Sequence, residues 1–222
     1  TLVKSSAASD VYKRQHCGGR YADIKYAHDG RFEKSVEIHS SWGTFEWILS
    51  DAFEEGYRVG IVGNSDGHKG RPGASYPGSS LFGAIGGLTC FLSKNLSREG
   101  IIDSINKRHH YATSGGPTGR MYIDLKANFT SEGLVFHDDP KLFDTKGRNS
   151  KEAIMGDIVN LPNGEMSLNI SVSTAVAIER LDIFNGSELI ETFKPFSEKD
   201  LGNRIRVIWE GAEYRGRFRQ TV

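Results

Sequence analysis

A strand, an amphipathic helix and a second strand follow one another between residues 34 and 63, and this order constrains the fold most strongly. The run KSVEIHS (residues 34–40) alternates, with Val36 and Ile38 on one face and Glu37 and His39 on the other. The run YRVGIVG (residues 57–63) is typical of a buried strand. A strand, a helix and a strand in this order predict a parallel βα unit.

The segment between these strands has helical periodicity. Thr44 is the predicted N-cap of a helix over residues 44–55, and Gly56 is its predicted stop. The apolar side chains recur at helical spacing: Phe45, Ile48, Leu49, Ala52 and Phe53. A second unit is predicted from a strand over residues 88–93 and a helix over 97–107, capped by Ser97, with Ile101, Ile102 and Ile105 facing inward.

The character of the chain changes after residue 116. Residues 121–125 and 165–173 alternate as strands do, and Asn185-Gly186 is a type I′ hairpin signal. Residues 204–209 predict a further strand. We therefore expect an α/β part over residues 16–116 and a separate antiparallel, β-sandwich-like domain over residues 117–222, which the sequence ends without an obvious finish.

The first residues call for a different explanation. The run SSAASDVYKRQ (residues 5–15) matches the translation of a transposon adaptor used to prepare sequencing libraries. We expect residues 1–15 to be adaptor-derived rather than native, and native sequence to begin near His16. The cellular compartment therefore stays open.

Composition excludes several classes of protein. Lys and Arg together number 28, as do Asp and Glu, so no overall positive field favours nucleic acid. No apolar run approaches the roughly 20 residues that a membrane span requires. The two cysteines, Cys17 and Cys90, lack zinc-site spacing and are predicted to be free thiols.

Histidines and acids gather at the predicted strand ends. His16 lies in a glycine-rich turn, Glu37 and His39 end one strand, and Asp66 and His68 follow the next. Ligands bind at the carboxyl ends of parallel strands, and imidazole with carboxylate is a typical ligand set for zinc, manganese or iron. Alone, the Asp-x-His pair fits a loop hydrogen bond or cap better than a metal site; together, the three clusters predict a metal site.

The motifs HCGGR, VEIHSS and GNSDGH, followed by LTCFLSKNLSREGIIDSINKRHHYATSG, resemble the later half of a PHP (polymerase and histidinol phosphatase) domain. The resemblance covers residues 16–116 and extends weakly into the β region. It is strongest to a branch of unknown function with a C-terminal β domain. It implies a distorted β/α barrel that holds two or three divalent metal ions and hydrolyses phosphoesters.

The resemblance also assigns roles. His16, Asp66 and His68 match metal ligands, and Glu37 matches an acid near the site; His39 has no clear counterpart and is kept as a ligand or substrate contact. Cys17 stands where the family has proline. The family's opening His-x-His motif and its middle ligands are missing from the sequence, so we expect a partial metal shell and weak activity from this chain alone.

Further residues are candidates for contact with a phosphorylated small molecule. Arg20, Lys69 and Arg71 can clamp a phosphate, and Arg20 joins Asp66 and His68 in the predicted catalytic set. Solvated surface charge is the alternative for each cation. Tyr76 and Ser79, in the long loop after residue 66, can contact substrate.

Three functions stay open. The first is a metal-dependent hydrolase, specifically a phosphoesterase; the second is a relative that binds metal or ligand without catalysis. The third is a carbohydrate- or protein-binding module that acts through the β domain, where Trp209 and Tyr214 are the aromatic candidates. His28 and the pair His109–His110 are predicted to be solvated rather than catalytic.

Overall fold

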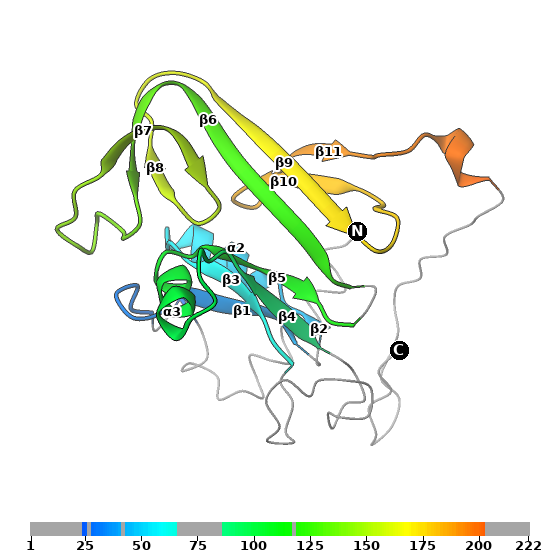
Figure 1. Ribbon diagram of the computed structural model, residues 1–222, viewed down its shortest axis with the longest axis horizontal. Coiled ribbons are helices and arrows are strands. Elements are labelled where there is room, and N and C mark those ends of the chain that lie inside the picture. Colours follow the sequence, from blue (N-terminus) through cyan, green and yellow to red (C-terminus); the bar gives the residue numbers. More distant parts are fainter. Residues whose placement is uncertain (1–23, 26–27, 41–42, 66–85, 117–118, 203–222) are drawn as a thin grey trace.

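The computed structural model describes residues 24–25, 28–40, 43–65, 86–116 and 119–202 (Figure 1). Within these ranges the chain is mostly β, with two short α-helices and several small sheets. The first part contains β1 (Ser35–Ser40), β2 (Gly43–Thr44), α2 (Trp47–Glu54), β3 (Gly60–Gly63), β4 (Gly87–Phe91), α3 (Arg98–Asn106) and β5 (His110–Ser114). The prediction of a fold with both α and β elements is confirmed at this level.

The first βα unit forms as the sequence predicts. β1 pairs in parallel with β3, with Ser35 opposite Gly60, and α2 connects the two strands. The helix begins later than predicted because Gly43–Thr44 pairs antiparallel with the end of β1 as β2. The N-cap is therefore Glu46, which makes no side-chain capping bond, and the prediction of Thr44 as the cap is wrong.

The second predicted βα unit is only partly confirmed. Ser97 caps α3, and its hydroxyl accepts from the Gly100 N–H. However, β5 returns antiparallel to β4 rather than parallel to it. Ile102 is half exposed at 50%, so its predicted inward position is wrong.

β5 nevertheless runs alongside β3. A Cβ atom on Gly60 would meet the His110 ring, and one on Gly63 would meet Ala112, so both strands run in the same direction. The Thr89 hydroxyl on β4 accepts from the Gly63 N–H (3.1 Å) and donates to the Gly63 carbonyl (2.9 Å). These contacts place β1, β3, β4 and β5 in one layer (Figure 1).

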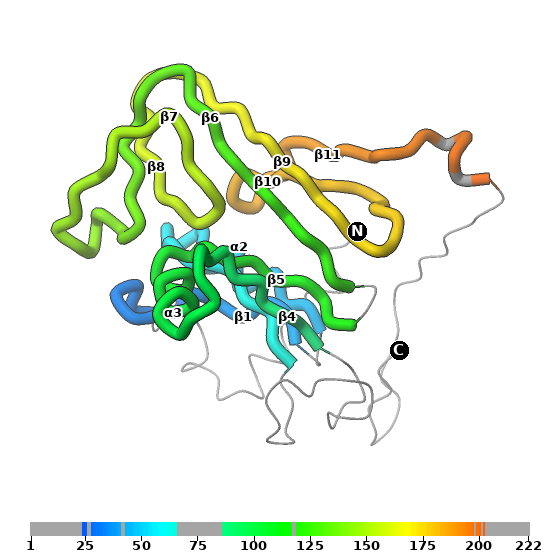
Figure 2. The backbone as a smooth tube through the Cα atoms, viewed as in Figure 1, coloured from blue at the N-terminus to red at the C-terminus, as the bar shows by residue number. Residues whose placement is uncertain are grey.

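The later part is built on one long strand, β6. β6 pairs antiparallel with β9 along its first half and with β7 and β8 towards its end (Figure 2). The bounds of these strands are β6 (Met121–Phe136), β7 (Arg148–Ile154), β8 (Ile158–Asn160) and β9 (Met166–Thr174). Their small apolar core consists of Ala127, Phe129, Val135 and Ala153, with Val159 and Leu161 against it. The predicted antiparallel character is confirmed, whereas a sandwich of two facing sheets stays a prediction.

β10 (Leu181–Asn185) and β11 (Glu188–Phe193) form the predicted hairpin as a separate two-stranded sheet. Asn185 pairs with Glu188, so the turn residues are Gly186 and Ser187 rather than Asn185 and Gly186. Gly186 has a φ of +61°, and Ser187 has no positive φ. A type I′ turn needs positive φ at both central residues, so the predicted turn type is wrong. A short 3-10 helix, η2 (Glu198–Leu201), follows.

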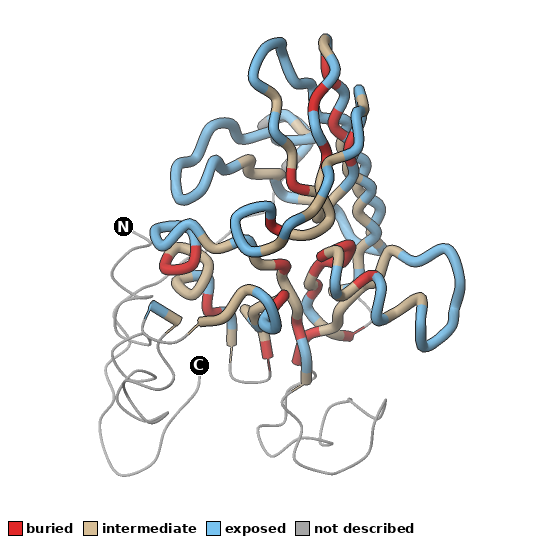
Figure 3. The backbone as a smooth tube through the Cα atoms, turned by 90° about the vertical axis from the view of Figure 1, so that its left-hand side faces the viewer, coloured by how far each residue is buried: buried red, intermediate tan, exposed pale blue. Residues whose placement is uncertain are grey.

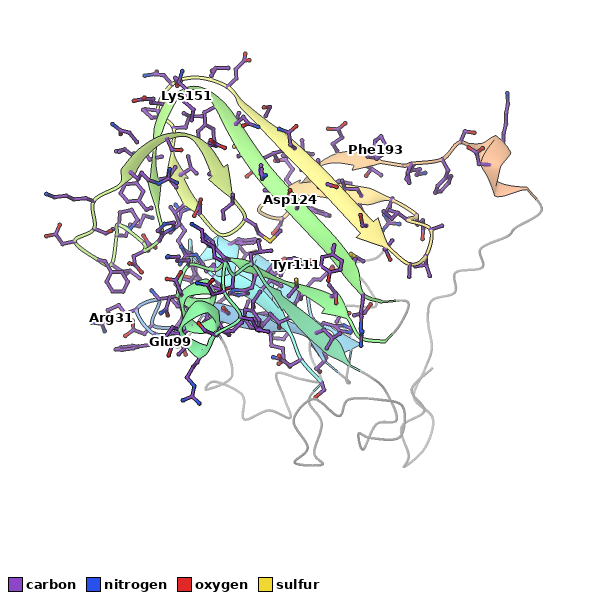
Figure 4. The ribbon with its side chains drawn as sticks, in the orientation of Figure 1. Arg31, Glu99, Tyr111, Asp124, Lys151 and Phe193 are labelled. Atoms are coloured by element: carbon purple, nitrogen blue, oxygen red, sulfur yellow. The ribbon has the colours of Figure 1, made fainter. Side chains whose placement is uncertain are left out.

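Polar contacts join the two parts of the chain. The Tyr111 hydroxyl, labelled in Figure 4, donates to the Met121 carbonyl (3.1 Å) and accepts from the Ile123 N–H (3.0 Å). The Lys34 ammonium lies 3.6 Å from the Asp138 carboxylate. Buried stretches are short and are interspersed with exposed ones (Figure 3). The polar contacts between the two parts therefore contribute to the stability of the fold.

The described strands do not close into a barrel, because β2-β1-β3 and β4-β5 are separate hydrogen-bonded sheets. The PHP-type barrel is therefore not found within the described ranges. None of the helices in these ranges combines the length and apolar character needed to cross a bilayer. The strand over residues 204–209, Cys17 and the 1–15 segment lie outside the described residues, and the domain boundaries at 15 and 116 stay predictions; Cys90 is a free thiol, as expected.

Candidate functional site

The carboxyl ends of β1 and β3 meet at one edge of the layer. The Asn64 N–H, just past β3, donates to the His39 carbonyl on β1 (3.0 Å). The Asn64 side-chain amide donates to the Glu37 carboxylate (2.5 Å). The predicted convergence of these two strand ends is therefore present.

His39 is oriented by its neighbours at this edge. Its Nδ1 lies 2.7 Å from the Thr44 hydroxyl on β2, and a Cβ atom on Gly87 would lie 2.9 Å from its Cδ2. The β1–β3 register shifts between Glu37 and His39. This irregularity interrupts the regular alternation from which we expected both side chains to share one face.

The remaining predicted site residues lie outside the described residues, so their roles stay predictions. They are His16, Arg20, Asp66, His68, Lys69, Arg71, Tyr76 and Ser79.

A second group of possible metal ligands lies elsewhere. One ligand atom each from His109, His137 and Asp157 lies within 4.8 Å of the other two. The Asp157 Oδ1 accepts from His109 Nε2 (2.9 Å) and from His137 Nδ1 (3.1 Å). The two imidazole rings meet edge to face, with centroids 5.5 Å apart. Among the described residues this is the one group of three or more such side chains that could hold a metal ion.

Arg108 links the segment that contains His109 to the segments that contain His137 and Asp157. Its guanidinium donates to the carbonyls of His137 and Gly156, the latter at 3.3 Å. Arg108 also directly precedes His109, and it is the one described non-glycine residue with a positive φ, 59°. Burial lowers the pKa of Arg108, while the nearby carboxylates Asp138 and Asp139 act in the opposite direction.

Asp157 is the buried centre of the group. Its side chain is 2% exposed, against 11% for His109 and 43% for His137. Burial alone would raise the pKa of Asp157, but the hydrogen bonds from His109 and from the Ile154 N–H bring it below its usual value. Asp157 therefore carries a negative charge at neutral pH, and an ionised carboxylate can only accept hydrogen bonds.

An open cavity of ≈ 770 Å³ adjoins this group, between α3 and β7. His109, His137 and Asp157 all line it, together with the charged side chains Lys94, Asp103, Lys107, Arg148 and Glu152. Asp103 is paired with Lys107 at 2.7 Å, and this contact lowers the pKa of Asp103, as do the nearby His109 and His137. The cavity gives the group contact with solvent on one side.

The sequence reasoning missed this group. His109 and His137 lie 48 and 20 positions from Asp157, and no motif spacing connects them. The prediction that His28, His109 and His110 are solvated is wrong: His109 and His110 are buried, and the His28 side chain is 5% exposed. The burial comes from residues distant in the sequence: His109 Nε2 contacts Asp157, and the His28 ring lies against Tyr57, with centroids 4.2 Å apart.

Comparison with protein-family models, curated proteins and solved structures finds no significant match. The function must therefore be argued from the two candidate sites themselves.

Proposed function

We propose that the chain is part of a metal-dependent hydrolase of the PHP type that acts on phosphoesters. The observation that carries this proposal is the parallel pairing of β1 with β3, which brings Glu37 and Asn64 into hydrogen-bond contact at the carboxyl ends of the strands. Asp66 and His68 lie two and four residues after Asn64 in the sequence, and ligands of parallel α/β folds bind at this edge.

The donors expected at this edge suit divalent manganese, zinc or iron. His39 and His68 offer imidazole nitrogens, and Glu37 and Asp66 offer carboxylate oxygens, which together form the ligand set of such metals. The hydrogen bond between His39 Nδ1 and Thr44 orients the ring and leaves Nε2 to ligate. His16 would complete the set available in this sequence.

The bound metal ions and nearby basic side chains would hold the substrate. Bound divalent ions would supply an activated water as nucleophile and would neutralise charge on the phosphoryl oxygens. Arg20, Lys69 and Arg71 would bind the phosphate, Arg20 and Arg71 with paired hydrogen bonds, and Tyr76 would contact the rest of the substrate.

Metal titration of the 222-residue chain tests the ligand set. We expect Mn²⁺ binding, measured by calorimetry, to weaken by roughly 100-fold or more in Asp66→Asn and in His68→Ala, since loss of even an outer-shell partner costs about 10–100-fold. Asp29→Asn, which removes an exposed carboxylate paired with Arg31, is the control and should bind Mn²⁺ unchanged. Unchanged stoichiometry and affinity in both ligand variants would refute the assignment.

Phosphate binding and turnover separate the alternatives. Inorganic phosphate should bind the Mn²⁺-loaded chain, and Arg71→Ala should weaken that binding. Slow hydrolysis of an aryl phosphate that is lost in His68→Ala would support catalysis. Metal and phosphate binding with no hydrolysis would instead favour the non-catalytic relative. The absence of both metal and phosphate binding would favour a binding module built on the β part.

A further inference from the structure

His109, His137 and Asp157 lie at the opposite edge of the layer from the strand-end site. β5 begins at His110, beside Gly60 at the start of β3, and ends at Ser114, beyond Gly63. The His110 Nε2 also lies 2.8 Å from the Ser35 hydroxyl at the start of β1. A five-residue strand spans about 13 Å, so the two groups cannot share one ion.

We propose that His109, His137 and Asp157 form a separate divalent-cation site suited to zinc. The ligands are His109 Nε2, His137 Nδ1 and an oxygen of Asp157, with a water in the fourth position. The site is independent of the strand-end ligands and does not rest on the hydrolase proposal.

Two of the three ligand separations are close to those of a zinc site. Zinc–nitrogen and zinc–oxygen bonds of about 2.0–2.1 Å in tetrahedral geometry place ligand atoms about 3.3 Å apart. The Asp157 Oδ1 lies 2.9 Å from His109 Nε2 and 3.1 Å from His137 Nδ1. These two separations need to grow by only a few tenths of an ångström, whereas the two imidazole nitrogens lie within 4.8 Å of each other and would move to about 3.3 Å. The proton now shared in each contact would pass from the ligating nitrogen to the other ring nitrogen or to water.

The donor types also select the metal. Two imidazole nitrogens and one carboxylate oxygen match the preference of Zn²⁺, whereas Mg²⁺ and Ca²⁺ require six or more oxygen ligands. The single negative charge of Asp157 partly balances the ion in a setting where its side chain is 2% exposed.

The surrounding residues hold the ligands in place before any ion binds. The Ile154 N–H donates to Asp157 Oδ2 (3.0 Å), which leaves Oδ1 to face the imidazoles. Arg108 binds the carbonyl of His137 and that of Gly156, the residue before Asp157. Such outer contacts fix ligand orientation and raise affinity.

The ion would join distant parts of the chain. His109 lies between α3 and β5, whereas His137 follows β6 and Asp157 lies between β7 and β8. The adjoining cavity of ≈ 770 Å³ and the 43% exposure of His137 give the fourth position access to water. Because the unfolded chain separates these residues, Zn²⁺ should stabilise the folded state.

Zinc titration tests the site in a chain that carries Asp66→Asn and His68→Ala, which removes two of the proposed strand-end ligands and so weakens competition from that site. We expect one equivalent of Zn²⁺ by calorimetry and a rise in Tm on binding. His137→Gln should weaken that binding by roughly 100-fold or more. The matched control is His28→Gln, because His28 also pairs with an acid, Glu33 at 3.0 Å, but belongs to no group of three possible ligands among the residues that the structure describes.

Measurement on the unaltered protein guards against misfolded variants. In histidine-ring ¹H–¹⁵N correlation spectra, Zn²⁺ should shift His109 and His137 together, and His110 much less. Cobalt(II) should give the visible absorption of a four-coordinate site, and Asp157→Asn should abolish it. Equal Zn²⁺ affinity in His137→Gln, or unmoved His109 and His137 resonances at saturating Zn²⁺, would overturn the proposal; it would leave the strand-end proposal standing, since that rests on other residues.

Discussion

Gly156 lies so close to Arg108 that a Cβ atom added to it would overlap the Arg108 carbonyl oxygen. Gly156 also has a φ of +91°, so both the lack of room for a side chain and the backbone conformation require glycine at this position. The contact sets the spacing between the segment that carries His109 and the turn that carries Asp157. The two segments, far apart in the sequence, are thus held together by backbone as well as by side chains.

Gly156→Ala should therefore destabilise the fold more than an ordinary glycine substitution. The backbone conformation costs about 1–2 kcal/mol for a residue with a Cβ, and the forced shift adds about 1–3 kcal/mol. Gly56→Ala is the control, because Gly56 has a φ of +72° but nothing within 4 Å of its Cβ position. Urea unfolding should show a clearly larger loss for Gly156→Ala; equal losses would contradict the close contact.

Replacing Arg108 should open the junction between the two parts. Arg108→Met keeps much of the apolar stem but removes the bonds to the carbonyls of His137 and Gly156, and each charge-assisted bond is worth about 1.5–3 kcal/mol. We expect the free energy of unfolding to fall by about 3 kcal/mol. Arg31→Met, at an exposed pair with Asp29, should change little. A similar small change in both variants would argue against a joining role for Arg108.

The cap of α3 can be tested against the uncapped start of α2. Ser97→Ala removes the hydroxyl that accepts from Gly100 N–H at 3.0 Å and should cost about 1 kcal/mol. Glu46→Ala, at an N-cap with no side-chain bond, should cost almost nothing. Paired thermal unfolding experiments measure both. Equal costs would show that the Ser97 contact contributes no stability.

The β10–β11 hairpin should have a titrating cross-strand contact. Asp182 accepts from Arg180 (2.7 Å) and from Thr192 opposite it on β11 (2.8 Å), and these bonds lower its pKa below 3.8. The ionised form therefore stabilises the hairpin fully above pH 3.8, and this stabilisation is lost as the pH falls through the lowered pKa. Carboxyl NMR titration should give a midpoint below 3.8 for Asp182, which rises in Arg180→Gln. A midpoint unaffected by that substitution would contradict the pairing.

The strands and helices whose residues show a clear local periodicity could be predicted from the sequence. The alternation in residues 34–40, the helical spacing after Thr44 and the serine at 97 each predicted an element that the structure contains. The errors came where a distant strand competed with a local preference. Thr44 joined β2 instead of capping a helix because β1 offered it backbone partners.

The candidate sites divide in the same way. The meeting of the carboxyl ends of β1 and β3 could be predicted in outline, because parallel strands bring these ends together whatever their side chains, and the Glu37–Asn64 contact lies at that edge. The metal site expected there stays a prediction. The second site could not be predicted, because His109, His137 and Asp157 belong to segments with no shared pattern. His109 was predicted to be solvated, but tertiary packing buries it, whereas the His137 side chain stays 43% exposed.

The amino-acid sequence by itself determined the parallel β1–α2–β3 unit, the antiparallel character of the later part, and the histidines and acids available at the strand ends. These properties depend on which face of each strand or helix is apolar, and the spacing of apolar residues along the sequence shows which face that is. Only the tertiary structure decided that β5 returns antiparallel to β4 and that Asp157 meets two imidazoles. Contacts across 48 positions depend on how whole elements pack, and no local spacing encodes them.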